Sequence, residues 1–131
     1  DQACYIPSLD IIRMPTREQF AKGEDYYCTR LHEMVHATGH KSRLNRELVG
    51  KFGSDAYAFE ELVAELGSWM MCSRIGLQGD LQHKSYLAHW IRILDFDKKA
   101  LFKAATLAQK AHDLCFEYLA AHESEREDQA A

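Results

Sequence analysis

Apolar and polar positions follow helical spacing along most of the chain, after a short extended stretch at the start. Residues 4–14 are rich in β-forming side chains and predict a strand. Pro7 places that strand at the edge of a sheet, because proline cannot donate a ladder hydrogen bond. Thr16 and Gln19 have the spacing of a capping box, so we expect a short helix over residues 16–22.

Four longer helices are expected after this stretch. Apolar residues at three-and-four spacing predict a helix over residues 24–38, and Gly39 is expected to end it in a left-handed conformation. The run LVAELGSWMMC is almost entirely apolar, so a helix over residues 56–75 should be buried on most sides. Two more helices are expected, one over residues 80–94 and a long last one that Asp97 caps.

A single domain accounts for all these elements. The pattern shows no internal repeat and no linker, so residues 1–122 are expected to form one α+β domain. That domain should be mostly helical, with a small N-terminal sheet and about four to five helices. Residues 123–131 are charged, and we expect them to be a disordered tail. A start at Asp1 rather than methionine predicts a piece of a longer protein.

Composition narrows the class of protein. The 131 residues are 47% apolar and 27% charged, as in ordinary globular proteins. The net charge of −4 argues against a generally basic nucleic-acid binder. No apolar run reaches the roughly 18 residues that span a bilayer, and no secretory signal is visible. We therefore expect no membrane partner. The four cysteines form no CxxC pair, so we expect reduced thiols in a cytoplasmic protein.

The segment HEMVH, residues 32–36, carries the most specific chemistry of the chain. Positions four apart share one face of a helix, so His32 and His36 can direct both imidazoles at one metal ion. Glu33 projects beside that ion, where a general base for an attacking water is needed. The alternative interpretation is a pair of surface histidines at the end of a helix.

A catalytic zinc ion also needs a third protein ligand and one open position. One variety of zincin takes a histidine ten residues after the first, but that position is Ser42 and His40 arrives two residues early. A glutamate from the buried helix is the other source. We predict Glu61 as the third ligand and Glu65 as the carboxylate that holds a ligand histidine. The reverse assignment, or Glu60 as the ligand, stays open.

Buried carboxylates on this helix need a partner, since burying an unpaired carboxylate costs several kcal/mol. A metal ion would satisfy Glu61 directly and Glu65 through a histidine. The alternative is a buried ion pair with an arginine such as Arg30 or Arg74.

Further candidates surround this site. Peptide hydrolysis benefits from a donor to the developing oxyanion. The side chains that could supply one or contact the substrate are Tyr57, Tyr86, His83, His89 and His40. A basic run could hold a phosphate backbone or an acidic peptide, or could be a solvated loop. Its members are Lys41, Arg43, Arg46 and Lys51. A substrate chain could add to the edge strand, in which Asp10 is expected to face solvent.

Three segments of the chain resemble a known family. They read YYCTRLHEMVHATGHKSRLNR, FGSDAYAFEELVAELGSWM and HKSYLAHWIRIL. Together they resemble the C-terminal zincin-like metallopeptidase domain of ArdC-type antirestriction proteins, a domain also found in TraC-type plasmid primases. The resemblance implies a gluzincin-like fold and a zinc site that falls on His32, His36 and Glu61, with Glu33 as the catalytic acid.

The resemblance also implies a function and partners. It implies hydrolysis of peptide bonds in a protein or peptide substrate, within a protein of a plasmid or other mobile element. Full-length members carry an N-terminal domain associated with single-stranded DNA, so such DNA or a restriction-system component is implied as partner of a longer parent. The alternative is an antirestriction or DNA-binding module in which the zinc is structural or vestigial and His40 closes its coordination.

Overall fold

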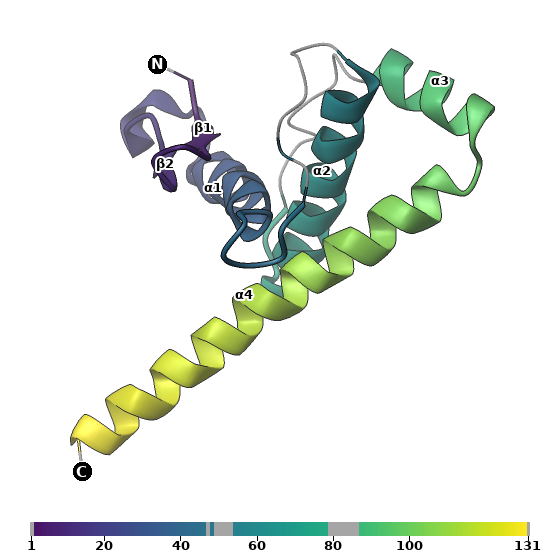
Figure 1. The fold of residues 1–131 in the computed structure, drawn as a ribbon. Coiled ribbons are helices and arrows are strands. Elements are labelled where there is room, and N and C mark those ends of the chain that lie inside the picture. Colours follow the sequence, from purple (N-terminus) through teal and green to yellow (C-terminus); the bar gives the residue numbers. More distant parts are fainter. Residues whose placement is uncertain (1, 47, 49–53, 79–86, 131) are drawn as a thin grey trace.

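The computed structural model describes residues 2–46, 48, 54–78 and 87–130, and these form four α-helices beside a two-stranded sheet. Helices α1 and α2 lie side by side, α4 packs against α2 and α1, and the sheet lies against α1 (Figure 1). In chain order the elements are β1 (Cys4–Ile6), β2 (Ile11–Arg13), the 3-10 turn η1 (Arg17–Gln19), α1 (Gly23–Thr38), α2 (Asp55–Ile75), α3 (Leu87–Phe96) and α4 (Ala100–Ala130). The expected mostly helical α+β architecture is confirmed.

Helix α2 is the central element, and its ends follow from its sequence. The hydroxyl of Ser54 accepts a hydrogen bond from the backbone N–H of Tyr57 at 3.2 Å, which caps the first turn. Gly76 follows the last turn with φ of 75°, a left-handed conformation that glycine adopts at little cost. Leu62, Val63 and Ala64 are all buried although they point in different directions. The predicted helix over 56–75 and its burial on most sides are therefore confirmed.

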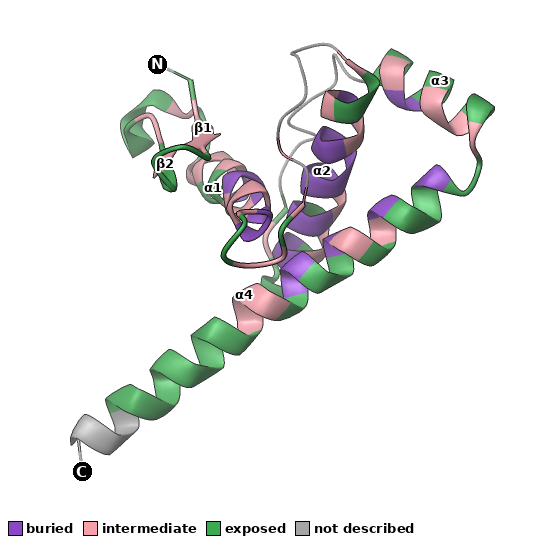
Figure 2. Ribbon diagram, in the orientation of Figure 1, coloured by how far each residue is buried: buried purple, intermediate pink, exposed green. Residues whose placement is uncertain are grey.

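The core lies where α1, α2 and α4 meet, and Figure 2 shows buried residues gathered along these contacts. Helix α4 contributes small side chains, Ala104, Ala108 and Ala111, all with no exposed surface. At the α1–α2 crossing, a Cβ on Gly67 would lie 2.8 Å from Val35 Cγ2. The three helices therefore approach one another closely because side chains at their contacts are small or absent.

The N-terminal stretch differs from the single edge strand expected over residues 4–14. Strands β1 and β2 form an antiparallel hairpin in which Tyr5 pairs with Ile12. Asp10 lies in the turn with φ of 53°, a conformation that aspartate tolerates better than most residues. The carboxylate of Asp10 is exposed, as expected, and it also accepts hydrogen bonds from Tyr5 Oη at 2.7 Å and from Arg43 Nη1 at 3.1 Å.

Other boundaries agree in part with the expected ones. The capping interaction exists, since the N–H of Thr16 donates to Gln19 Oε1 at 2.9 Å, but the helix is only one 3-10 turn. Asp97 Oδ1 accepts from the N–H of Lys99 at 2.9 Å just before α4. Helix α4 continues through Ala130, so no end of secondary structure marks the boundary expected after residue 122.

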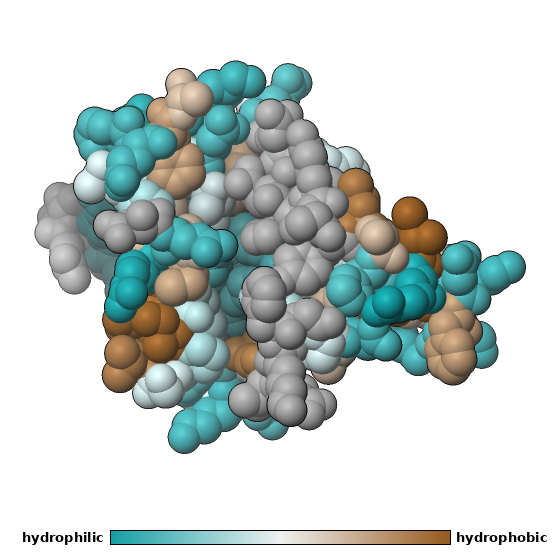
Figure 3. Space-filling view, turned by 90° about the horizontal axis from the view of Figure 1, so that it is seen from above, coloured by the Kyte–Doolittle hydropathy of each residue, from teal (hydrophilic) through white to brown (hydrophobic). Residues whose placement is uncertain are grey.

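Helix α3 is the most loosely covered helix. The start of the helix expected over 80–94 lies outside the described residues, and α3 runs on to Phe96. Trp90 anchors α3, since its indole N–H donates to the carbonyl of Ala58 at 2.8 Å. Phe96 and Ile91 of α3 are 95% and 59% exposed. Figure 3, which views the molecule from above, shows apolar side chains on the side where α3 lies. None of the described helices has the length and apolar character needed to cross a membrane.

Candidate metal centre

Helix α1 brings the two histidines of HEMVH together. His32 and His36 lie one turn apart, and their Nε2 atoms are 3.2 Å from each other. The imidazole of His32 is almost fully buried, whereas His36 retains a little exposed surface at the edge of a cavity. Both rings therefore present Nε2 to the same point in space, as the four-residue spacing predicts.

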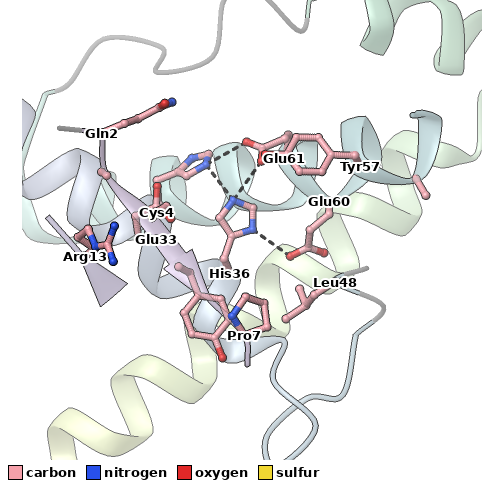
Figure 4. A pocket seen from close by; sticks show the side chains of 14 residues that line it. Gln2, Cys4, Pro7, Arg13, Glu33, His36, Leu48, Tyr57, Glu60 and Glu61 are labelled. Carbon is pink, nitrogen blue, oxygen red and sulfur yellow. Dashed lines mark hydrogen bonds and ion pairs between the residues drawn. The ribbon is translucent and has the colours of Figure 1, made fainter. Parts of the chain in front are cut away.

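Helix α2 adds a carboxylate at this point. Glu61 places Oε2 at 3.2 Å from His32 Nε2 and Oε1 at 3.4 Å from His36 Nε2 (Figure 4). Among the described residues, His32, His36 and Glu61 form the group whose donor atoms lie close enough to share one ion, all within 4.8 Å. The structure thus brings together the three side chains that the sequence singled out.

The spacing of these donors fits a small divalent cation. Zinc binds histidine nitrogen and carboxylate oxygen at about 2.0–2.2 Å in a tetrahedron, which places the ligand atoms about 3.3 Å from one another. The three separations between the imidazoles and the carboxylate are 3.2, 3.2 and 3.4 Å. Two imidazoles and one carboxylate also match the donor types of catalytic zinc sites.

A second carboxylate lies beside the Nδ1 atom of each histidine ring. Glu65 Oε2 lies 3.3 Å from Nδ1 of His32, and Glu60 Oε1 lies 3.3 Å from Nδ1 of His36. A carboxylate on the far nitrogen fixes the orientation of the ring and leaves Nε2 for a metal. The sequence predicted this position for Glu65, whereas it offered Glu60 only as an alternative ligand.

Arg46 completes the support and was missed as a partner of the buried glutamates. Its guanidinium donates to both oxygens of Glu60, at 2.8 and 3.1 Å, to Thr38 Oγ1 at 2.9 Å and to the carbonyl of Val35 at 2.7 Å. Its side chain is only 5% exposed. Arg46 therefore joins the end of α1 to the carboxylate that orients His36. Its position in a basic run gave no signal of this role.

Gly39 is required for a close contact of the chain and not for the left-handed turn that the sequence predicted. It follows α1 but has φ of −78°, so the expected left-handed conformation is wrong. A Cβ at this position would lie 3.0 Å from Arg46 Cζ and 2.8 Å from Leu48 Cδ2. The glycine is needed because the chain after α1 folds back over it and passes the guanidinium of Arg46 at close range.

The other basic residues of the run are also engaged. Arg43 donates through Nε to the carbonyl of Ala37 at 2.7 Å and pairs with Asp10 of the hairpin turn. Lys41 is exposed, and Lys51 lies outside the described residues. An arginine partner for a buried glutamate does exist, but it is Arg46.

The remaining arginines and the cysteines have other surroundings. The guanidinium of Arg74 lies over the ring of Phe116, 3.9 Å from the ring centroid. Arg74 therefore stacks on an aromatic ring and is not the arginine that pairs with a buried glutamate. The four thiols are free, as expected. Two of them, Cys28 and Cys72, join α1 to α2 with their sulfur atoms 3.1 Å apart.

The electrostatics of the cluster are strongly coupled. Burial on its own would lower the pKa of His36, but hydrogen bonds to Glu60 and Glu61 outweigh it and raise that pKa to about 9. The same balance, with Glu61 and Glu65 as partners, raises the pKa of His32. Burial would raise the pKa of Glu61, yet hydrogen bonds to both histidines hold it well below its usual value. Glu61 is thus ionised at neutral pH and attracts positive charge.

Glu33 lies next to this cluster at the wall of a cavity of about 550 Å³. Its residue is 6% exposed, and its carboxylate has no hydrogen-bond or ion-pair partner among the described residues. The described residues that line the cavity are Gln2, Ala3, Cys4, Tyr5, Pro7, Arg13, His32, Glu33, His36, Leu48, Ala56, Tyr57, Glu60 and Glu61. Both histidines, Glu61 and Glu33 thus border the same cavity.

Of the residues predicted to contact the oxyanion or the substrate, some line the cavity and others do not. Tyr57 lines the cavity. His40 instead lies 2.7 Å from Ser42 Oγ and 4.0 Å from Asp10, outside the group that could share an ion. His89 lies on α3 and does not contribute to the cavity wall. Tyr86 and His83 lie outside the described residues.

Comparison with known proteins places this geometry in a family. The sequence profile of a zincin-like metallopeptidase family matches residues 1–107. The chain belongs to this family. The zincin-like chain is 46% identical over 120 residues to the DNA primase TraC of Escherichia coli, covering 89% of its own length and 8% of the primase. It is 44% identical over 114 residues to the uncharacterized protein y4eC of Sinorhizobium fredii, covering 86% of itself and 37% of that protein.

Solved structures agree with the family. The Mn(II)-bound crystal structure of the antirestriction protein ArdC from plasmid R388 is 46% identical, with a TM-score of 0.81. The match covers 88% of the zincin-like chain and 44% of ArdC. The metal-free ArdC structure matches with the same TM-score at 47% identity. The zincin-like chain thus spans less than half the length of each of these relatives, and a divalent metal is consistent with the family and with its own donor set.

Proposed function

We propose that the chain is a zinc-dependent peptidase domain that hydrolyses peptide bonds in a protein or peptide. In this proposal His32, His36 and Glu61 hold the zinc ion, and Glu33 is the catalytic acid and base. One observation carries the proposal: three donor atoms converge at the wall of an open cavity, and the described residues supply no fourth ligand. A structural zinc site would be closed by four protein ligands.

The residues divide the chemistry among them. The zinc ion, when bound, would polarise the scissile carbonyl and make an adjacent water more acidic. Glu33 follows His32 directly in α1 and borders the cavity, so its carboxylate can take a proton from the attacking water. The same carboxyl group then returns the proton to the leaving amine. Glu65 and Glu60 keep the two imidazoles in orientation throughout.

Zinc is the proposed metal, although a similar ArdC structure contains manganese. Manganese prefers sites rich in oxygen donors, whereas two nitrogens and one oxygen at tetrahedral spacing suit zinc. Elemental analysis of protein purified without added metal would distinguish the two.

The test of the catalytic role is Glu33→Gln in zinc-loaded protein. Incubation with a peptide mixture from a digested bacterial lysate, followed by mass spectrometry, should show cleavage by the native protein. The variant should retain zinc, since Glu33 is not among the three donors, and lose cleavage by a factor of at least about 100. Glu24→Gln changes an exposed glutamate at the start of the same helix and should leave cleavage intact. Equal cleavage by native and Glu33→Gln protein would contradict the catalytic assignment.

The second candidate is a binding module without proteolysis, which the names of the relatives favour because ArdC is an antirestriction protein and TraC a DNA primase. In a longer parent, single-stranded DNA or a restriction-system component would be the partner. For this chain alone we expect weak DNA binding, since Arg43 and Arg46 are engaged in internal ion pairs. Fluorescence anisotropy with a labelled single-stranded oligonucleotide at physiological salt measures this, and tight binding would favour the module over the peptidase.

A further inference from the structure

Some charged side chains of the cavity wall have ion-pair partners, and Arg13 has none among the described residues. Of the described residues in the wall, Arg13 is the only arginine or lysine. Among the wall carboxylates, Glu60 is paired with Arg46, and Glu61 faces the two histidines. The side chain of Arg13 is exposed and has no hydrogen-bond or ion-pair partner among the described residues. Its positive charge is therefore free to act on a molecule that enters the cavity.

The hairpin holds Arg13 in place at this wall. Arg13 ends β2 and is paired across the sheet with Cys4, which also lines the cavity. The turn of the hairpin is tied to the end of α1 through the hydrogen bonds of Arg43 to Asp10 and to the carbonyl of Ala37. The same helix carries the histidines, so the position of Arg13 relative to them is set by the fold.

The opposite wall is different in character. Figure 4 shows Arg13 and Glu33 on one side of His36, with Tyr57, Leu48, Glu60 and Glu61 on the other. Arg13, the only arginine or lysine among the described residues of the wall, thus lies on one side of His36, and the carboxylates of Glu60 and Glu61 lie on the other. A carboxylate of a bound peptide would therefore be attracted to the Arg13 side of the cavity and repelled by the other side.

We propose that Arg13 binds a carboxylate of the substrate, so that the site selects peptides with an aspartate or glutamate on one side of the scissile bond. This deepens and rests on the proposed peptidase function. A guanidinium can form two parallel hydrogen bonds with a carboxylate, which gives both strength and orientation. A nucleic-acid backbone suits the site less well, because its many phosphates are held by several cations and Arg13 is the only arginine or lysine among the described residues of the wall.

The experiment measures binding rather than turnover. Monohydroxamates of dicarboxylic acids with two to five methylenes carry a metal-binding group and a free carboxylate, and their terminal amides are the uncharged controls. Calorimetry with zinc-loaded protein should show at least one acid binding about 10- to 100-fold more tightly than its amide. Arg13→Ala should reduce this ratio to near one and leave acetohydroxamate binding unchanged. Arg30→Ala, which removes an exposed arginine of α1 outside the cavity wall, should preserve the ratio.

Several results would overturn the proposal. A ratio near one for every chain length in the native protein would do so, as would a preference for acids that survives Arg13→Ala. Displacement of the acidic hydroxamate by a single-stranded oligonucleotide would assign Arg13 to phosphate instead. If the native protein failed to bind acetohydroxamate, the metal centre itself would be wrong and this subsite with it. An inactive peptidase would still show the acid preference, so the two failures are distinguishable.

Discussion

The ion pair of Arg46 with Glu60 offers a stringent test of how the site is supported. The Arg46 side chain is 5% exposed and that of Glu60 12%, so Arg46→Met would leave a nearly buried carboxylate with only His36 as a partner. Removal of one member of a buried pair costs about 3–5 kcal/mol. Such a loss is a large part of the roughly 5–15 kcal/mol that stabilises a typical domain.

The assay is urea unfolding of the metal-free protein at pH 7, followed by circular dichroism. With a slope of about 1–3 kcal/mol/M, the midpoint of Arg46→Met should fall by on the order of 2 M. The double variant Arg46→Met/Glu60→Gln should recover part of this loss, because an amide is less costly to bury than a charge. Arg92→Met is the control, since its ion pair with Asp55 is mostly exposed and should contribute less than about 1 kcal/mol.

Two outcomes would refute this reasoning. One is an unchanged midpoint for Arg46→Met, which would mean that Glu60 is solvated or neutral. The other is a double variant as unstable as the sum of the single changes, which would mean that the two side chains act independently. A zinc titration of the same variants should show an affinity about 10- to 100-fold lower, because Glu60 orients a proposed ligand.

Two further predictions concern stability. Because the pKa of His36 rises from 6.5 to about 9 on folding, protonated His36 stabilises the metal-free fold below pH 6.5, and this contribution disappears between about pH 6.5 and 9. Urea midpoints of metal-free protein should fall across that window, and a flat profile would mean that His36 is not protonated in the fold. Gly67→Ala should destabilise the protein by about 1–3 kcal/mol, because the added methyl group meets Val35 Cγ2 at 2.8 Å. Thermal unfolding measures the loss, and Val35→Ala in the same chain should relieve part of it.

Much of the helical architecture was predictable because its signals are local. The periodic apolar positions of α1 and α2 and the terminal Gly76 are properties of adjacent residues. The prediction that two histidines and Glu61 converge used helical spacing, the cost of burying a carboxylate and the known ligand sets of zincins. The same argument placed Glu65 behind His32.

What the sequence could not indicate depends on the path of the chain between elements. The role of Arg46 arises because the segment after α1 turns back over Gly39, and no local pattern distinguishes that path from a solvated basic loop. The assignment of Glu60 follows from the same path, since its carboxylate is claimed by Arg46 and His36 together. The division of residues 4–14 into a hairpin was missed because Asp10 in a left-handed conformation is not apparent from β propensity.

The close crossing at Gly67 has a consequence for the choice of metal. The imidazoles belong to α1 and the carboxylate of Glu61 to α2, so the separation of these two helices sets the size of the space among the donors. That separation is limited where Val35 meets a residue without a side chain. In the proposed metal centre, discrimination between ions of different radius would therefore be governed in part by a position that touches no ion, and an evolving lineage could adjust its metal preference there without altering a single ligand.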